Sequence, residues 1–414
     1  MEKMVIISAP WVVPVAVPVI RDGSIVVTGG RILDIGRRDD IIGKYPQSSE
    51  IKYPCVLMPG LVNAHMHLEL THLAGGFCSL PAQKFTEWID ALIARRAQNK
   101  ESRDEIVAAF TTALKEQYNS GVALIGDIGN EQYDELDGVA GGLQPKIVRM
   151  LEFIGPNKKG CQAAMTNLLH LDENTAATGH APYSTAPDLL KEIKKRCRRL
   201  QHIFSIHACE CADEREFLQT GTGCFRDFLE KKSSWDGIFP FSETGFSGTI
   251  QYFAHLGLLD DTTLLVHCVH VSAKELLVIK DSGAKICLCP GSNGFLANGH
   301  APVELMVDLG LLPALGSDSA ASNQSLDIWR EMQILAVNHT RIAPADILAM
   351  ATMGGAQALL HETEYGSLAV GRSAKFIHVS SPDLRICNDS AHLMDILVAN
   401  GKPAEIEWVS SVYD

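Results

Sequence analysis

Four histidines and one aspartate lie at positions where they could bind a metal ion and act on water. His65 and His67 form a His-x-His pair, while His207, His267 and Asp318 each end a short apolar run. Imidazoles combined with a carboxylate and an open coordination position are typical of a catalytic metal site rather than a structural one. The His-x-His pair alone is equally well explained as two ordinary loop residues, so the interpretation depends on the other three positions.

Short apolar runs alternate with longer amphipathic segments through the middle of the chain. The runs are Ala123–Asp127, Ile147–Phe153, Ile203–His207, Leu264–His267, Ile286–Cys289 and Pro313–Asp318. Alternating β and α units predict a parallel sheet with helical crossovers. In a barrel of this kind the carboxyl ends of all strands open onto one face, so polar residues that are distant in sequence converge there.

The two ends of the chain predict a second, smaller unit. Near the N-terminus, Gly29-Gly30 separates the strand-like runs Ser24–Val27 and Arg31–Ile35. Near the C-terminus, a glycine-punctuated segment leads into another strand-like run, Lys375–Val379. We expect the two ends to pair into one small β-sandwich.

Chain length fits this division. The 414 residues suffice for a TIM barrel of about 250 residues plus a smaller unit. The predicted fold class is α/β, a (β/α)8 TIM-like barrel over residues 58–364, with the β-sandwich built from residues 1–57 and 365–414.

Composition excludes several classes of protein. Hydrophobic residues make up 46% of the chain, as in globular proteins, and the formal net charge of −13 without a long basic run argues against nucleic-acid binding. A small neutral or cationic substrate is expected instead. The eleven cysteines have no framework spacing and are predicted to be reduced thiols of a cytoplasmic protein. Prolines interrupt the apolar stretch 9–20, which is too short to span a membrane.

Four segments, in this order, resemble one protein superfamily. They are Pro59-Gly60-Leu61-Val62-Asn63-Ala64-His65-Met66-His67, His207-Ala208-Cys209-Glu210, Val266-His267-Cys268-Val269-His270 and Gly316-Ser317-Asp318-Ser319-Ala320-Ala321-Ser322-Asn323. Together they resemble the amidohydrolase superfamily, and more narrowly its aminohydrolase branch of chlorohydrolases, guanine deaminases and adenosine-type nucleoside deaminases. The resemblance runs from about Asp22 to Val379. It implies a hydrolase acting on carbon–nitrogen bonds other than peptide bonds.

The resemblance also implies one metal site. In this branch, the residues matching His65, His67, His207 and Asp318 bind a single divalent ion, which is expected to be zinc, with iron as the alternative. Binuclear relatives carry a carboxylated lysine at the end of the fourth strand. The matching segment here is Gly179–Tyr183, which contains no lysine, so a mononuclear site is implied.

Catalytic roles follow from the same resemblance. Glu210 would carry a proton from the attacking water to the substrate ring, His267 would polarise the reacting group, and Asp318 would accept the first proton of the water. The alternative for Glu210 is a solvated acidic face shared with Asp213, Glu214 and Glu216. His180 matches a position that touches the substrate ring in purine-type relatives.

Two acidic residues bear on the choice of substrate. Glu69 follows the His-x-His pair and Glu152 ends the third strand, where deaminases of homocysteine nucleosides tend to carry arginine. We expect both carboxylates, with His180, to bind substrate. Motifs such as His67-Leu68-Glu69-Leu70-Thr71 and Phe85-Thr86-Glu87-Trp88 resemble aminodeoxyfutalosine deaminases of menaquinone biosynthesis.

Other activities remain open at this point. A deaminase of adenosine, methylthioadenosine or S-adenosylhomocysteine, a guanine deaminase, a triazine hydrolase and an amidase on a small substrate would all use the same activated water. A barrel that binds a ligand without turnover is the non-enzymatic alternative. The sequence also leaves open whether two copies form a homodimer.

Overall fold

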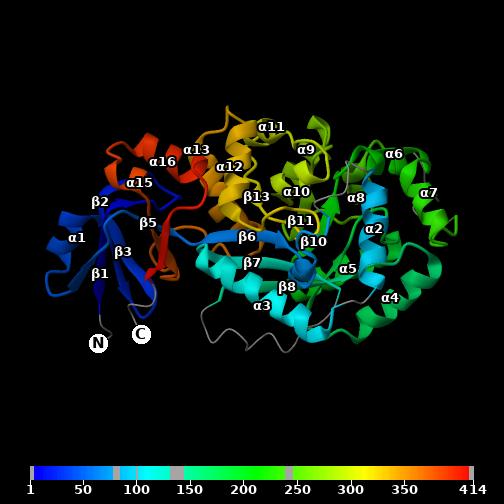
Figure 1. The fold of residues 1–414 in the computed structure, drawn as a ribbon, viewed down its shortest axis with the longest axis horizontal. Helices are drawn as coiled ribbons and strands as arrows, with labels where there is room; N and C mark the ends of the chain where they lie inside the picture. The colour runs from blue at the N-terminus through cyan, green and yellow to red at the C-terminus, as the bar shows by residue number, and fades with distance from the viewer. Residues whose placement is uncertain (1–3, 78–83, 99–100, 131–143, 238–245, 410–414) are drawn as a thin grey trace.

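A computed structural model describes residues 4–77, 84–98, 101–130, 144–237 and 246–409 of the chain. Figure 1 shows a β-rich part at one end, which holds both termini, and a larger α/β part at the other. The predicted site residues all lie within the described ranges.

The α/β part contains two parallel sheets of four strands each. Their orders are β6-β7-β8-β9 and β10-β11-β12-β13. The strands are β6 Leu61–Met66, β7 Val122–Gly129, β8 Lys146–Phe153, β9 Ala176–Gly179, β10 Phe204–Ala208, β11 Thr263–His267, β12 Lys285–Leu288 and β13 Ala314–Leu315. Most of their residues are buried, which is typical of parallel strands covered on both faces. The α/β architecture with parallel strands is thus confirmed.

The two sheets touch at the strand ends that carry the predicted chemistry. The amide of His207 in β10 donates to the carbonyl of His180, which follows β9, at 3.0 Å. The amide of Asp318, which follows β13, donates to the carbonyl of His65 in β6 at 3.0 Å. An isolated parallel bridge joins Met66 to Asp318. In the described part of the chain no continuous ladder connects the two sheets.

Helices alternate with these strands along the chain. They are α2 Phe85–Ala97, α3 Arg103–Asn119, α4 Lys158–His170, α5 Pro187–Leu200, α6 Ala212–Thr220, α7 Cys224–Lys231, α8 Thr249–His255, α9 Ala273–Ser282, α10 Pro290–Phe295, α11 Val303–Asp308, α12 Ile328–Asn338, α13 Pro344–Ala349 and α14 Gly355–Ala358. The short segments η1 Leu68–Leu73 and η3 Met350–Gly354 complete this part. Helix α3 begins with a capping box, in which Ser102 accepts from the amide of Glu105 and Glu105 accepts from that of Ser102.

The β-rich part is one seven-stranded sheet made from both chain ends. Its order is β15-β14-β5-β1-β2-β3, and β4 also pairs with β1. The elements are β1 Val5–Val12, β2 Ile20–Thr28, β3 Arg31–Arg37, α1 Arg38–Lys44, β4 Ser49–Lys52, β5 Val56–Pro59, β14 Phe376–Ser380, α15 Pro382–Ile386, α16 Ser390–Ala399 and β15 Glu405–Trp408. Antiparallel pairing of β14 with β5 joins the two ends, as the sequence predicts.

One strand of this sheet begins earlier than expected. The first strand-like run identified in the sequence is Ser24–Val27, yet β1 starts at Val5 and continues through Pro10. Pro10 is the one exposed residue of β1, and the strand's ladder to β2 is interrupted there, between Ala9 and Trp11. A proline without an amide donor is tolerated in a strand at such a position.

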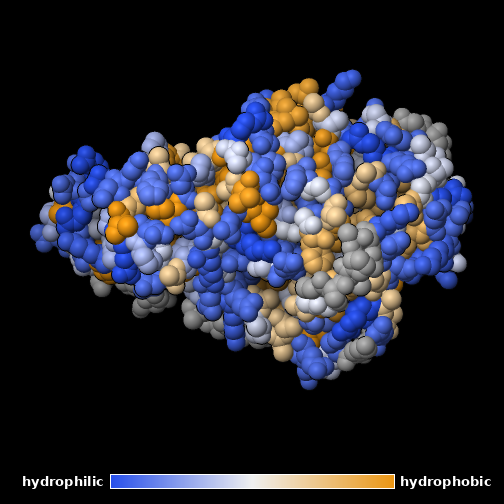
Figure 2. All heavy atoms as spheres, turned by 45° about the horizontal axis from the view of Figure 1, so that its top comes forward, coloured by the Kyte–Doolittle hydropathy of each residue, from blue (hydrophilic) through white to orange (hydrophobic). Residues whose placement is uncertain are grey.

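The cysteines, the helices and the surface of the described part bear on the expectations drawn from composition. The ten cysteines among them are all free thiols. None of the described helices has the length and hydrophobicity to span a bilayer. Hydrophilic residues cover most of the face drawn in Figure 2, and the hydrophobic ones lie in separate groups.

Candidate metal centre and active site

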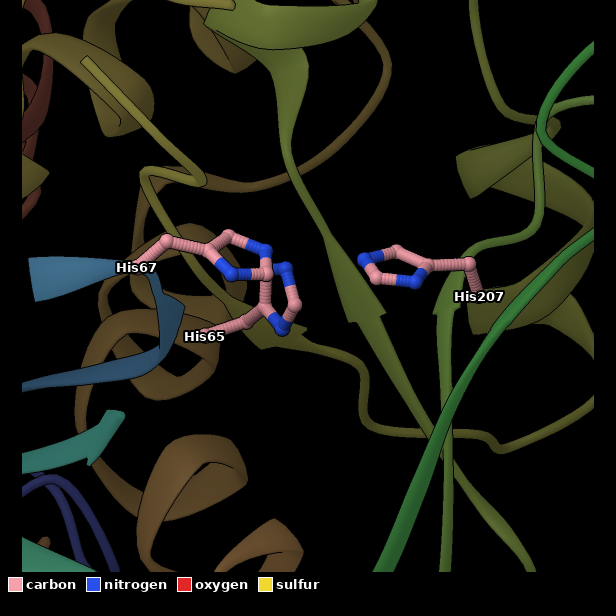
Figure 3. Close-up of side chains that lie close together, drawn as sticks. All are labelled: His65, His67 and His207. Atoms are coloured by element: carbon pink, nitrogen blue, oxygen red, sulfur yellow. The ribbon is translucent and has the colours of Figure 1, made fainter. Parts of the chain in front are cut away.

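Three imidazoles come together where the two parallel sheets meet. His65 and His67 come from the end of β6 and its continuation, and His207 comes from β10. Residues i and i+2 of a strand point to the same face, so the His-x-His spacing directs both side chains to one side. One ligand nitrogen from each of the three lies within 4.8 Å of the others, and all three residues are buried. Figure 3 shows the rings pointing toward one another.

The chemistry of these nitrogens fits a transition-metal ion. Neither ring nitrogen of His65 has a hydrogen-bond partner, although the residue is fully buried. Nδ1 of His207 lies 2.7 Å from the carbonyl oxygen of His180, so Nδ1 carries the proton and Nε2 keeps its lone pair. Burial lowers the pKa of His67 to about 4, which keeps that ring neutral and able to bind a metal.

Asp318 lies beside this cluster. Its Oδ1 is 3.5 Å from Nε2 of both His65 and His67. Its Oδ2 accepts hydrogen bonds from the hydroxyls of Ser292 at 2.6 Å and Ser322 at 2.9 Å. The two hydroxyls fix the carboxylate so that Oδ1 faces the histidines.

Glu210 and His267 occupy the adjoining side of the site. Nδ1 of His267 lies 3.0 Å from the amide oxygen of Asn293, so it donates its proton there. Its Nε2 then faces Oε1 of Glu210 at 3.6 Å and Oδ2 of Asp318 at 4.0 Å. Burial, with Asp318 and Glu214 nearby, raises the pKa of Glu210 well above its ordinary value. A raised pKa favours the protonated carboxyl group, which is the form that a general acid needs.

The backbone around Glu210 is held by a second buried carboxylate. Glu214 Oε1 accepts from the amide of Cys209 at 2.7 Å, and its Oε2 accepts from the amide of Glu210 at 3.2 Å. Thr249 also donates to Glu214. Glu210 and Glu214 are 4% and 0% exposed, so the solvated acidic face is the wrong interpretation for both, whereas Glu216 is exposed.

Unfavourable backbone conformations gather at this site. Ten described non-glycine residues have a positive φ, and four of them are Cys209 (52°), His267 (76°), Cys268 (48°) and Asp318 (60°). Each such residue costs about 1–3 kcal/mol and persists only where surrounding structure enforces it. Here the amide of Cys268 donates to the carbonyl of Ala208 at 2.9 Å, which ties the turn after β11 to β10.

The predicted substrate-binding residues lie in two layers. One ligand atom each from Glu152, His180 and His207 lies within 4.8 Å of the other two, so Glu152 and His180 border the metal cluster. Nδ1 of His180 is 2.7 Å from the hydroxyl of Ser184. Glu69, by contrast, already accepts hydrogen bonds from Arg96 at 3.2 Å and from the amide of Asn130 at 2.9 Å.

Several residues of the site were not singled out by sequence reasoning. Ser292, Glu214, Arg96 and Asn130 act on the predicted residues through hydrogen bonds from other elements. Ser322 was missed as well, although it belongs to the family-like segment Gly316–Asn323 and could have been identified from that motif. Asn293 in α10 also contacts His267 directly.

Comparison with known proteins assigns the family. Residues 56–404 match the sequence profile of the amidohydrolase family. The chain belongs to this family. It is therefore a hydrolase that acts on carbon–nitrogen bonds. Its similarity to a 5-methylthioadenosine/S-adenosylhomocysteine deaminase from Moorella thermoacetica is 28% identity over 429 residues, covering 96% of this chain and 93% of that protein.

Solved structures of two deaminases share the fold of this chain. The Helicobacter pylori aminofutalosine deaminase, solved with methylthio-coformycin, superposes with a TM-score of 0.80 at 24% identity and covers 97% of both chains. An adenosine deaminase from Xanthomonas campestris with bound zinc gives a TM-score of 0.75 at 21% identity, covering 98% of this chain and 92% of the other.

Proposed function

We propose that this amidohydrolase removes the amino group of a 6-aminopurine nucleoside by metal-dependent hydrolysis. The observation that carries the proposal is the placing of Glu210 and His267 beside Asp318 and the three clustered histidines. That arrangement provides a water-activating side and a proton-carrying side in one buried site. The similarity to a nucleoside deaminase over nearly the whole chain supports the same reaction.

His65, His67, His207 and Asp318 are the proposed ligands of one divalent ion. Three imidazoles with one carboxylate favour zinc or iron over magnesium, and we propose zinc, with iron as the alternative. When bound, the ion would act as a Lewis acid that makes water nucleophilic at neutral pH. The unpartnered nitrogens of His65 support this assignment.

The chain's own residues would then move the protons. Asp318 would accept one proton of the attacking water, and Glu210 would deliver a proton to N1 of the purine as water adds to C6. His267, whose Nδ1 donates to Asn293, would accept a hydrogen bond through Nε2 from the attacking water as its oxygen bonds to C6. Asp318 would pass its proton to the departing amino group and the new C6 hydroxyl would return a proton to Glu210, so that cleavage of the C6–N bond releases ammonia and leaves a 6-oxo product.

For the substrate we propose aminodeoxyfutalosine, with His180 and Glu152 forming its binding side and Glu69 supporting that side through Asn130. The fold shared with aminofutalosine deaminase is compatible with this choice, and so is an acid rather than an arginine at position 152. The relatives named for methylthioadenosine and S-adenosylhomocysteine make those nucleosides the second candidates. A guanine deaminase, a triazine hydrolase or an amidase would use the same catalytic residues with a different pocket.

We propose that the two parallel sheets form one (β/α)8 barrel over residues 58–364. We propose also that residues 1–57 and 365–414 form a β-sandwich, of which 1–3 and 410–414 lie outside the described residues. We predict a small-molecule substrate, no nucleic-acid or membrane partner, a homodimer and a cytoplasmic location.

Ammonia release from a panel of substrates, with chloride release measured for the chlorotriazine, tests the proposed reaction. The panel contains adenosine, methylthioadenosine, S-adenosylhomocysteine, aminodeoxyfutalosine, guanine, a chlorotriazine and a small amide. We expect turnover only of 6-aminopurine nucleosides, fastest for aminodeoxyfutalosine, and about a 10²–10⁴-fold lower kcat in Glu210→Gln with unchanged metal content. Turnover of guanine, the triazine or the amide in place of nucleosides would refute the proposal.

A further inference from the structure

One carboxylate oxygen beside the metal cluster is buried and has no partner. Glu152 is 8% exposed, and its Oε1 makes no hydrogen bond, whereas Oε2 accepts one from Nδ2 of Asn130 at 3.0 Å. Glu152 borders His180 and His207. A buried acceptor without a partner is costly in an isolated protein, so its position points to a ligand that supplies a donor.

Three residues behind Glu152 fix where this oxygen points. Arg96 donates from Nη1 to Oδ1 of Asn130 at 3.1 Å and from Nη2 to Oε1 of Glu69 at 3.2 Å. The amide of Asn130 donates to Oε2 of Glu69 at 2.9 Å. We refer to Arg96, Glu69 and Asn130 together as the relay.

The relay can be assembled in only one orientation. A guanidinium group is only a donor, so the amide oxygen of Asn130 must face Arg96 and its NH₂ group must face Glu152. That NH₂ group also lies 3.3 Å from the carbonyl oxygen of Glu152. Asn130 therefore donates to both the backbone carbonyl and one carboxylate oxygen of Glu152. The other carboxylate oxygen, Oε1, is left to accept from a ligand.

The absence of a side chain at Gly129 leaves space for the carboxylate of Glu69. A Cβ at this position would lie 2.8 Å from Oε2 of Glu69, closer than real Cβ contacts. Glu69 has its charge balanced by Arg96 and lies behind Asn130, whereas the charge of Glu152 has no cationic partner among the described residues.

We propose that the relay is a positioning device that holds Glu152 as the acceptor for a ribose hydroxyl, and so determines selectivity for intact nucleosides. The inference rests on the proposed function. Glu152 ends β8, two strands before β10, which leads to Glu210. Glu152 lies beside His180 and His207, at the border of the metal cluster. Apart from the reacting amino group, the hydrogen-bond donors of a 6-aminopurine nucleoside are its ribose hydroxyls, so a ribose hydroxyl is the donor that the free oxygen of Glu152 can accept. Asn130 and Arg96 are thereby positioning residues, and Glu69 acts through Asn130.

The test compares the nucleoside that the wild-type enzyme deaminates fastest with its 2′,3′-dideoxy analogue. A site built around a hydrogen bond to a hydroxyl discriminates strongly against an analogue without it, by about 10⁴-fold. We expect Asn130→Ala to reduce this ratio of kcat/KM values by about 10- to 100-fold, the value of a hydrogen bond to a charged group. Gly129→Ala should have a similar effect by displacing Glu69. Turnover of the dideoxy analogue and metal content should stay unchanged.

Arg95→Ala is the matched control, because Arg95 is the neighbour of Arg96 in α2 but pairs with Glu101. It should keep the wild-type ratio, while Arg96→Ala should lower it. An unchanged ratio in Asn130→Ala and Gly129→Ala, or equal losses on both substrates, would overturn the relay while leaving the proposed function intact. Absence of any nucleoside turnover by the wild-type enzyme would overturn both.

Discussion

We expect Glu214→Gln to impair catalysis, although Glu214 acts on the backbone that carries Glu210 rather than on the substrate. Glu214 accepts the amides of Cys209 and Glu210 on its two oxygens, and Gln offers only one acceptor oxygen. In either orientation of Gln, one backbone amide faces an NH₂ group, so one hydrogen bond to a charged group, about 1.5–3 kcal/mol, is lost. The peptide that carries Glu210 then loses its fixed position.

The expected result is a kcat lowered by about 10- to 100-fold, because a small misplacement of a catalytic group can cost about 10²-fold. Metal content should equal that of the wild type, since no predicted ligand contacts Glu214. Steady-state ammonia release measures kcat, and elemental analysis measures the metal. Glu216→Gln is the control on the same helix, α6, because Glu216 is exposed. A Glu214→Gln enzyme with wild-type kcat would refute the positioning argument.

Two further predictions concern stability. Lys194, 1% exposed, donates to Asp260 at 2.5 Å and to Thr262 and Thr263 at 2.9 and 2.7 Å. Asp260 keeps its ion pair with Arg198 when Lys194 is removed, so Lys194→Met should lower the free energy of unfolding by about 1.5–3 kcal/mol. The adjacent Lys195→Met, at a 77% exposed side chain, should change it little in urea titrations, and equal losses would contradict the argument. The hydrogen bond from Arg38 lowers the pKa of Glu50 from 4.5 to about 2. Glu50 therefore stabilises the fold above pH 4.5, and because solvent screens this surface pair the contribution is about 1 kcal/mol, which is lost as the pH falls toward 2. Urea titrations at pH 7 and pH 3 should show a smaller pH effect in Glu50→Gln, and an identical effect would refute the assignment.

Strand ends explain why much of the site could be predicted from the sequence. His207 and His267 are the polar residues near the ends of buried β10 and β11, and parallel strands bring such ends to one face. The spacing of His65 and His67 directs both rings inward for the same reason. These inferences need only local pattern and topology.

Residues that act from a neighbouring element could not be predicted in this way. Asn130 follows the end of β7, and the pairing of β7 with β8 brings it beside Glu152. Arg96 lies in α2, and only the packing of that helix brings it to Asn130 and Glu69. The sequence presents Glu69 as a substrate contact, because nothing local reveals that Arg96 and Asn130 already bind it.

Strand lengths show a similar limit. The apolar run Pro313–Asp318 predicts a strand, but β13 comprises only Ala314–Leu315. Gly316 packs against the carbonyl of His65, where a Cβ would lie 2.7 Å from that oxygen, and Asp318 adopts a left-handed conformation. The need to bring Asp318 to the histidines ends the strand early.

Metal titration of the chelated enzyme tests the central claim most directly. Zinc is added to metal-free protein while ammonia release from the best nucleoside of the panel is measured. The account predicts no turnover without metal, a linear rise, and saturation at one zinc per chain, with no recovery in the His65→Ala/His67→Ala variant. Full turnover by the metal-free protein, or saturation only at two ions per chain, would contradict a single metal centre formed by His65, His67, His207 and Asp318.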